Sequence, residues 1–330
     1  MQTDDLMRRA MAVAQTARCR TSPNPWVGCV IATRDGRTFE GSTEPPGGRH
    51  AERVAIYAAI AAGADLRGAT VAVTLEPCSH HGRTPPCAEA LIRAQVGQVH
   101  IGVRDPDTRV SGRGIAMLRA AGIEVVEDVF GDEVTEQLAP YLHHRRTGRP
   151  FVVLKMATTL DGCIAAADGT SQWITGSAAR TAAHQLRAES DAILVGAGTV
   201  RADDPSLTTR LVEGPSPRRV VLGRAPSTAK VHPCLEWQGP IPELLDHLGA
   251  DGVLQVLVEG GARVAASFLD EGLVDRSVVY VAPAVMGDGT TAWPGERTPT
   301  IAALRRGRTV SARRVGDDVE IVIEPARAGA

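Results

Sequence analysis

Residues 50–52 read His-Ala-Glu, and residues 76–87 read Glu-Pro-Cys-Ser-His-His-Gly-Arg-Thr-Pro-Pro-Cys. The first stretch opens an expected helix, and the second directly follows an expected strand. His50, Cys78 and Cys87 offer one imidazole and two thiols, and zinc prefers such ligands in a tetrahedron of four. Three protein ligands leave one position for water, whose pKa zinc lowers to about 7. The two stretches therefore predict a catalytic zinc site within an α/β domain.

Glu52 lies two residues after His50, at the first turn of the expected helix. Its carboxylate is expected to take a proton from the water and pass it to a ring nitrogen and a departing amine. Two other interpretations stay open for this region. The cysteines are buried thiols, or His80 or His81 completes a purely structural zinc site.

The flanking sequence predicts alternating strands and helices in the first half of the chain, which indicates a mostly parallel sheet covered on both faces. A basic segment, residues 143–150, is expected to be a linker. The expected strands cover residues 27–32, 69–75, 99–103 and 124–126, and the helices cover 4–19, 50–62, the region of Leu91, 115–121 and 131–144.

A second α/β series follows. Ser177 is expected to cap its first helix. Glycines at 196, 198, 260 and 261 lie between strands and helices, where backbone amides can approach phosphates, although ordinary turns use such glycines equally often. Residues alone indicate only a nucleotide-binding domain. The expected strands cover residues 151–154, 192–195, 219–222, 254–258 and 277–281, and the helices cover 177–187 and 262–269.

Composition narrows the class of substrate. Lys plus Arg is 36 and Asp plus Glu is 38, so the net charge of -2 gives no basic excess for a nucleic-acid backbone. No apolar run is long enough to span a membrane, and the acidic start of the chain resembles no signal peptide. The six cysteines are typical of thiols in a reducing compartment. We therefore expect a cytoplasmic enzyme acting on a small molecule, with no nucleic-acid or membrane partner.

The order His-x-Glu followed by Pro-Cys and Cys is the signature of zinc-dependent nucleobase deaminases. Here eight residues separate Cys78 from Cys87, instead of two. With this longer loop, the chain resembles the bifunctional riboflavin-biosynthesis deaminase/reductase family. The resemblance covers nearly the whole chain and extends through Thr21-Ser22-Pro23-Asn24-Pro25-Trp26-Val27-Gly28, Asp105-Pro106, Ser111-Gly112-Arg113-Gly114, Lys155-Met156-Ala157-Thr158-Thr159-Leu160-Asp161-Gly162, Ser171-Gln172-Trp173-Ile174-Thr175, Gly198-Thr199-Val200, residues 203–208 and Val258-Glu259-Gly260-Gly261.

The resemblance implies two domains. Residues 1–146 would form a cytidine-deaminase-like α/β/α domain with one zinc ion per chain, and residues 147–330 a dihydrofolate-reductase-like α/β domain that uses NADPH. The implied substrate is 2,5-diamino-6-ribosylamino-4(3H)-pyrimidinone 5′-phosphate, which is deaminated and then reduced from ribosyl to ribityl. In the first domain Asn24, His80 and Arg83 would bind it. Asn24 alternatively forms an Asx turn before Pro25, and His80 is alternatively a solvent-exposed side chain.

In the second domain the resemblance assigns residues by position. Lys155 would polarise the sugar oxygen. The implied substrate-binding residues are Ser171, Arg187, Leu207, Arg210 and Glu259, and the implied cofactor-binding residues are Thr158, Trp173, Thr199, Asp203, Gly261, Ala262 and Arg263. We also expect a homo-oligomer assembled through this domain.

The sequence departs from the family at two places. Thr43 stands where the family has a histidine shortly before the zinc ligand. The segment 223–253 is shorter than expected for the family and lacks an obvious β-α unit. The alternative to a bifunctional enzyme is therefore a monofunctional deaminase with an inactive reductase-like domain.

Two rivals from other classes are considered. An RNA-editing deaminase needs a basic face with stacking aromatics, whereas only 11 of 330 residues are Phe, Trp or Tyr. A zinc-stabilised binding module predicts that Glu52→Ala leaves function intact.

Overall fold

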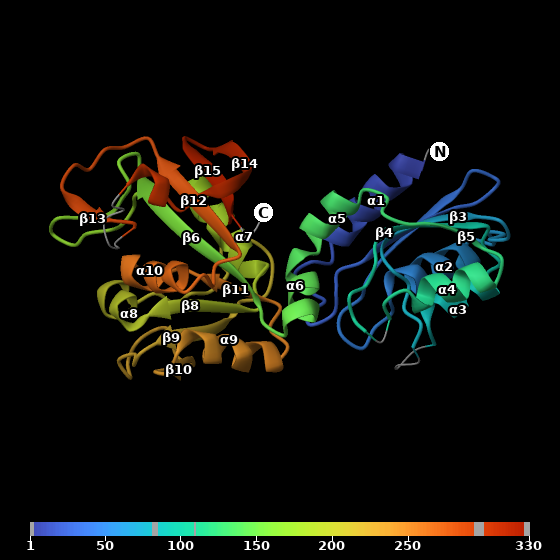
Figure 1. Ribbon diagram of the computed structural model, residues 1–330, viewed down its shortest axis with the longest axis horizontal. Coiled ribbons are helices and arrows are strands. Elements are labelled where there is room, and N and C mark those ends of the chain that lie inside the picture. The colour runs from blue at the N-terminus through green and yellow to red at the C-terminus, as the bar shows by residue number, and fades with distance from the viewer. Residues whose placement is uncertain (1–2, 81–84, 109, 294–299, 327–330) are drawn as a thin grey trace. The chain divides into compact units, whose positions relative to one another are not determined.

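The computed structural model describes residues 3–80, 85–108, 110–293 and 300–326. The chain divides into two compact units, Met1–Gly148 and Arg149–Ala330 (Figure 1). Each unit has its own sheet and its own helices, which is the general arrangement expected for two α/β domains.

The sheet of the first unit has the strand order β2-β1-β3-β4-β5. β1 is antiparallel to both β2 and β3, while β3, β4 and β5 are parallel. Its strands are β1 (Gly28–Ala32), β2 (Thr38–Ser42), β3 (Thr70–Leu75), β4 (Gln98–Val103) and β5 (Glu124–Val126). Its helices are α1 (Thr3–Gln15), α2 (Ala51–Ala61), α3 (Cys87–Arg93), α4 (Arg113–Ala120), α5 (Gly131–Gln137) and α6 (Ala139–Thr147).

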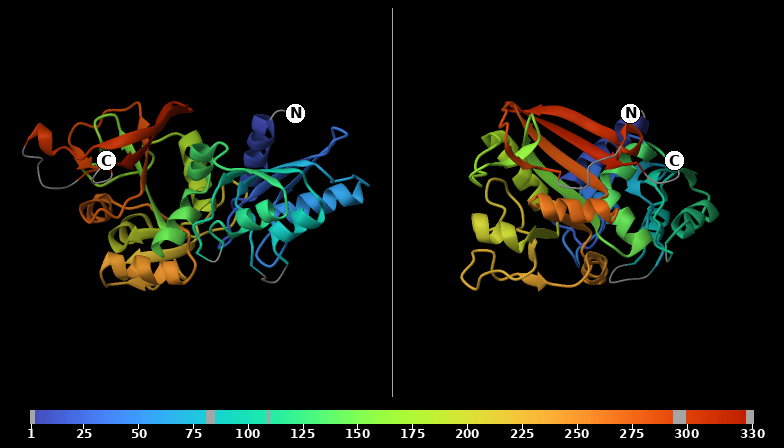
Figure 2. Two further views of the ribbon diagram at one scale, coloured as in Figure 1. Left: turned by 45° about the vertical axis from the view of Figure 1, so that its right-hand side comes forward. Right: turned by 60° about the vertical axis from the view of Figure 1, so that its left-hand side comes forward.

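Two glycines show how closely helices cover the two faces of this sheet. A Cβ on Gly28 would lie 1.9 Å from the Ala10 carbonyl oxygen of α1, and one on Gly41 would lie 2.3 Å from the Ala51 carbonyl oxygen of α2. Gly41 pairs with Cys29, the neighbour of Gly28, so the two glycines face opposite sides. In the left view of Figure 2 the dark-blue α1 and the lighter blue α2 accordingly lie on opposite sides of the strands. The unit is an α/β/α sandwich.

The main sheet of the second unit has the strand order β10-β9-β8-β11-β6-β12-β15-β14. The first six of these strands are parallel, and β15 and β14 form an antiparallel hairpin beside β12 (Figure 1). The strands are β6 (Phe151–Thr159), β8 (Ala192–Gly196), β9 (Arg218–Leu222), β10 (Leu235–Trp237), β11 (Gln255–Val258), β12 (Arg276–Ala282), β14 (Gly307–Val315) and β15 (Asp318–Pro325), with a small separate pair, β7 (Cys163–Ala166) and β13 (Gly289–Thr291).

Helices cover this sheet on two faces. α9 (Ile241–Ala250) and α10 (Ala262–Asp270) pack through Leu244 and Phe268 into a core that includes Leu154 and Met156 of β6. Lys155, the residue between them, therefore points to the opposite face. The remaining helical elements are α7 (Ser177–Ala188), α8 (Ala197–Asp203) and the short 3₁₀ turn Ile301–Ala303.

The structure corrects several sequence predictions in the first unit. The sheet was expected to be mostly parallel but is mixed. The polar strand β2, which was not predicted, forms an antiparallel hairpin with β1. The single helix expected over 131–144 is two helices, α5 and α6, with Leu138 between them and Pro140 in the first turn of α6. The prediction of a linker over 143–150 is wrong for its first part, since α6 continues to Thr147. The helix ends at Gly148, whose backbone has the left-handed conformation.

In the second unit, the residue that caps α7 is Gly176, not Ser177. The Gly176 N–H donates to the Asp318 carboxylate of β15 over 2.8 Å, so a residue of the distant hairpin satisfies the helix end. The segment 223–253 does contain a β-α unit, β10 followed by α9. β10 has only three residues, and this is why its pattern was not recognised.

No helix in the described part of the chain is long and apolar enough to cross a membrane.

Candidate functional site

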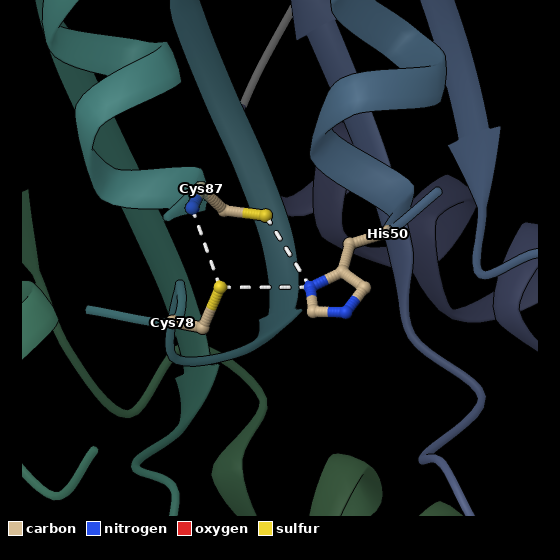
Figure 3. Close-up of side chains that lie close together, drawn as sticks. All are labelled: His50, Cys78 and Cys87. Atoms are coloured by element: carbon tan, nitrogen blue, oxygen red, sulfur yellow. Dashed lines mark hydrogen bonds between the residues drawn. The ribbon is translucent and has the colours of Figure 1, made fainter. Parts of the chain in front are cut away.

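Three sulfur and nitrogen ligands converge at the amino ends of two helices (Figure 3). His50 immediately precedes α2, Cys78 follows β3, and Cys87 is the first residue of α3. His50 Nδ1 lies 3.5 Å from the sulfur of Cys78 and 3.5 Å from that of Cys87. The three ligand atoms all lie within 4.8 Å of one another. One imidazole and two thiols at these separations fit a zinc ion with one further position.

The charges at the site also suit a cation. The hydrogen bond to Cys78 raises the pKa of His50 to about 9, although burial opposes this shift. The hydrogen bond from Cys87 lowers the pKa of the Cys78 thiol, and the backbone N–H of Cys87 donates to the same sulfur over 3.3 Å. An electron-rich sulfur that stabilises a neighbouring imidazolium provides the negative potential that a divalent cation needs.

Glu52 lies at the first turn of α2 and is 4 % exposed. Burial first, and then the negative charge of Cys78, raise the pKa of its carboxyl to about 7. A carboxyl group with a pKa near neutrality can both accept and release a proton. The position and protonation behaviour of Glu52 therefore suit a general acid–base group beside the three ligands.

Glu76, whose role was not predicted from the sequence, holds the cysteine segment in place. Its buried carboxylate accepts the backbone N–H groups of Gly112, Gly114 and Ile115 over 3.0 to 3.4 Å. A Cβ on Gly114 would lie 2.0 Å from the carbonyl oxygen of Pro77, so the first turn of α4 packs directly against the residue preceding Cys78. The signal was the glycine pair 112 and 114 together with an acidic residue at the end of a buried strand.

The substrate residues predicted for the first unit are only partly located. Asn24 is half-buried in the loop before β1, where its backbone N–H closes a turn to the Thr21 carbonyl, and His80 is exposed. Arg83 and His81 lie outside the described residues. Thr43 is buried, and its hydroxyl accepts the Val27 N–H over 3.1 Å, so it fixes the backbone just before β1.

The second unit brings three of its predicted residues together. Arg187 of α7 makes a two-pronged ion pair with Glu259, at 2.7 and 2.8 Å, and both side chains are 13 % exposed. Lys155 of β6 is near enough for the charges of both residues to act on it, while burial lowers its pKa. This arrangement gathers two cations and one carboxylate beside the sheet, where a phosphorylated sugar could be recognised.

His184, which the sequence analysis did not single out, joins this cluster. Its Nδ1 accepts the backbone N–H of Arg210 over 3.0 Å. Burial first, and then the neighbouring charges of Arg187 and Arg210, lower its pKa to about 4. Leu207 is buried in the same loop with a positive φ of 54°.

The residues predicted to bind the cofactor lie after the carboxyl ends of parallel strands. Thr158 is the last residue but one of β6, Thr199 lies in the helix after β8, and Gly261 follows β11 and caps α10. In parallel α/β sheets, ligands bind at this edge. A Cβ on Gly261 would be 3.6 Å from the Thr199 hydroxyl, so these two segments are neighbours. Ala262 and Arg263 form the first turn of α10.

Of the remaining three residues, Asp203 ends α8, and Ser171 and Trp173 lie in the segment between β7 and α7. The Ser171 hydroxyl lies 3.4 Å from the Asp203 carboxylate, which joins a predicted substrate residue to a predicted cofactor residue. Trp173 is 65 % exposed, with the Arg180 guanidinium 4.7 Å from its ring centroid.

Comparison with known proteins agrees with these two sites. Residues 1–103 match the family described as the cytidine and deoxycytidylate deaminase zinc-binding region, and residues 150–321 match the RibD C-terminal domain. Riboflavin biosynthesis protein RibD of Mycobacterium tuberculosis is 41% identical over 336 residues, covering 96% of this chain and 95% of that protein. The Escherichia coli RibD protein is 37% identical over 366 residues, covering 97% and 98%.

Two solved structures match nearly the whole chain. Acinetobacter baumannii RibD, form 1, has a TM-score of 0.90 and 36% identity, covering 98% of this chain and 99% of that one. A Thermotoga maritima protein described as a diaminohydroxyphosphoribosylaminopyrimidine deaminase/5-amino-6-(5-phosphoribosylamino)uracil reductase has a TM-score of 0.89 and 35% identity, covering 98% of both chains.

The fold and the two sites thus define a bifunctional enzyme, a zinc-dependent deaminase fused to an NADPH-dependent reductase. The chain belongs to the RibD family of riboflavin biosynthesis proteins. The alternative of a monofunctional deaminase is not favoured, because the reductase match covers residues 150–321 and the segment 223–253 retains its β-α unit.

His184 generates a prediction about pH. Its pKa in the folded protein, about 4, lies below the ordinary value of 6.5, so the unfolded chain binds more protons between these values. The stabilisation by neutral His184 is complete above pH 6.5 and is lost as the pH falls towards 4. In His184→Gln the amide oxygen can still accept the Arg210 N–H, but the side chain takes up no proton. Between pH 7 and pH 4.5, the unfolding free energy of this variant should therefore fall by roughly 2 to 3 kcal/mol less than that of the wild type.

Chemical unfolding at several pH values measures this difference. His247→Gln, which changes an exposed histidine of α9 that lies 3.8 Å from Asp251, is the matched control and should not reduce the loss of unfolding free energy at low pH. Parallel pH profiles for the wild type and His184→Gln would contradict the prediction.

Proposed function

We propose that this enzyme deaminates 2,5-diamino-6-ribosylamino-4(3H)-pyrimidinone 5′-phosphate and then reduces the ribosyl group of the product to ribityl. The observation that carries the proposal is the convergence of His50, Cys78 and Cys87 beside a buried Glu52. The substrate class is supported by the names of the relatives and by the description of the Thermotoga maritima structure.

In the first reaction, water replaces an exocyclic amino group of the ring, and ammonia leaves. Zinc, when held by the three ligands, lowers the pKa of water and so supplies the nucleophile at neutral pH. Glu52 would take a first proton from the water and pass it to the ring nitrogen, and then take the second proton from the added hydroxyl and pass it to the departing amine. Asn24, His80 and Arg83 are proposed to hold the substrate.

In the second reaction, NADPH supplies the hydride that reduces the sugar carbon. Lys155 is proposed to polarise the sugar oxygen, and Arg187, Arg210 and Ser171 to bind the phosphorylated chain together with Leu207 and Glu259. The residues proposed to hold NADPH are Thr158, Trp173, Thr199, Asp203, Gly261, Ala262 and Arg263. The support for this is the grouping of Lys155, Arg187 and Glu259 and the position of the cofactor residues at one edge of the sheet.

We assign the deaminase to residues 1–146 and the reductase to residues 147–330. The two compact units and the two family matches support this division. We also place the enzyme in the cytoplasm. The support is that all six cysteines are free thiols, and zinc binding by two of them requires a compartment that keeps thiols reduced.

We further propose that the protein self-associates through its second unit. β14 lies at the edge of the sheet, and Leu160, Val285 and Ile301 expose 69%, 73% and 78% of their area in the same unit. An edge strand and exposed apolar side chains favour pairing with another chain. Light scattering of the purified full chain should therefore give a mass of at least twice 34.7 kDa, and a monomer mass at micromolar concentration would refute the proposal.

The deaminase assignment predicts the effect of Glu52→Gln. The variant keeps the shape of the side chain but cannot accept the proton, so the rate of ammonia release should fall about 10²- to 10⁴-fold. Its zinc content should stay the same, because Glu52 is not a ligand. Reduction of separately supplied deaminated substrate, followed by NADPH absorbance, should also be unchanged.

The matched control is Glu89→Gln on α3, a half-buried carboxylate that forms an ion pair with Arg93. It should release ammonia at the wild-type rate. Normal ammonia release by Glu52→Gln would refute the proposed mechanism and favour a non-catalytic zinc module.

The reductase assignment predicts the effect of Arg210→Ala. Because Arg210 is proposed to bind the substrate phosphate, kcat/KM for NADPH oxidation should fall about 10- to 100-fold, mainly through KM. Ammonia release should not change. The matched control is Arg218→Ala at the start of β9, whose partner is Asp251, and it should oxidise NADPH normally. Equal effects of the two substitutions would exclude a specific phosphate contact.

A further inference from the structure

A second group of metal-binding side chains lies in the segment in which this chain is shorter than expected. His232, Cys234 and Glu236 each offer one possible ligand atom, and all three atoms lie within 4.8 Å of one another. Among the described residues, only this group and His50, Cys78 and Cys87 meet that criterion. We propose that His232, Cys234 and Glu236 form a second zinc site, which stabilises the short edge strand β10 and the loop before it.

The backbone explains why these side chains meet. Cys234, directly before β10, and Glu236 within it are alternate residues, and alternate residues of an extended chain point to the same side. His232 precedes the strand, and its Nδ1 lies 3.5 Å from the Cys234 sulfur. Within the described residues, β10 pairs with β9 alone, over the register Leu235↔Val220 to Trp237↔Leu222, and it forms one edge of the sheet. Metal-binding side chains here are therefore accessible from one side.

The imidazole of His232 is held in a tautomer suited to metal binding. Its Nε2 lies 3.0 Å from the Pro226 carbonyl oxygen, so this nitrogen carries the proton and donates it. Nδ1 then has its lone pair available and lies 3.5 Å from the Cys234 sulfur. Metal-ligating histidines ordinarily donate their second N–H to a carbonyl in this way. His50 presents Nδ1 to its cysteines at the same distance of 3.5 Å.

The other groups are also held in place before any ion binds. Glu236 Oε1 accepts the Ala225 N–H over 2.9 Å, which leaves its second oxygen for a metal. The Arg219 guanidinium donates to the carbonyl oxygens of Val231 and His232 at 3.1 and 3.0 Å and so fixes the backbone of the first ligand. Binding therefore costs little further ordering of side chains.

The donor set selects the metal class. An imidazole nitrogen, a thiolate sulfur and a carboxylate oxygen together suit zinc, and the two negative groups offset its double charge. His232 and Cys234 are half-buried and Glu236 is exposed, so an ion can reach the site from solvent and complete its coordination with water.

The site has a structural consequence for the neighbouring reductase region. Between Ala225 and His232 the loop reaches α8, where the Lys230 N–H donates to the Asp204 carboxylate over 2.8 Å. Asp204 directly follows Asp203, a proposed cofactor residue. A zinc ion joining His232 to β10 would fix the end of this loop that leads into the strand, while the contact with Asp204 fixes its middle.

The test is the zinc content of the full-length protein, measured by mass spectrometry after exhaustive dialysis against zinc-free buffer. We expect two zinc ions per chain for the wild type and one for Cys234→Ser, with ammonia release unchanged. The matched control is Cys19→Ser, which alters a half-buried cysteine outside both groups and should retain two. One zinc ion per chain in the wild type, or two in Cys234→Ser, would overturn the proposal.

A second variant guards against an effect of Cys234→Ser on folding. Glu236→Gln keeps an oxygen that can accept the Ala225 N–H but removes the charged ligand, so the loop should retain its structure. Titration of zinc into the chelator-treated full chain should show one of two binding events weakened at least about tenfold. Cobalt in place of zinc should add a sulfur-to-metal absorption band that Cys234→Ser reduces by about one third, since one of three cysteine ligands is lost. Unchanged affinity together with an unchanged band would refute the site.

Discussion

The structure of the first unit depends on bringing one imidazole and two sulfurs together from segments that are distant in the sequence. Cys78 and Cys87 lie 28 and 37 residues after His50, yet both sulfurs lie 3.5 Å from its Nδ1. This is possible because α2 and α3 both begin at one end of the sheet. Gly41 lets α2 approach its strand closely, and Gly114 with Glu76 holds the segment before Cys78. The chemistry of the site is thus set by how closely helices approach the sheet.

The second unit meets a different constraint, the burial of charge. Arg187 and Glu259 are nearly inaccessible to water and would be costly to bury separately. The two side chains satisfy each other through two hydrogen bonds. Lys155 and His184 lie close by, and burial lowers the pKa of both. A buried ion pair of this kind contributes little net stability. Its position beside the proposed sugar-phosphate site instead suits a role in substrate binding.

The sequence predicted the zinc ligands because their types and spacing are specific, and it predicted the strands that are buried and rich in β-branched residues. It failed where structure depends on tertiary contacts. β2 and β10 are short and partly polar, so neither shows the pattern of a buried strand. The cap of α7 is a glycine whose N–H bonds to Asp318, a partner 142 residues away. Glu76 and His184 were missed because only the fold shows which backbone amides they accept.

The hydrogen bond between Gly176 and Asp318 joins residues 142 positions apart. Contacts of this kind determine which unit can fold first while the chain is being synthesised. The first unit is complete once residue 148 has been made, so its sheet can form while the rest of the chain is still being translated. The second unit cannot finish in this way, because β6, its first strand, pairs with β11 and β12, and β12 pairs with β15 near the end of the chain. Such long-range pairing slows folding. Deaminase capacity therefore arises earlier on the ribosome than reductase capacity, and chains cut short by premature termination would retain only the former.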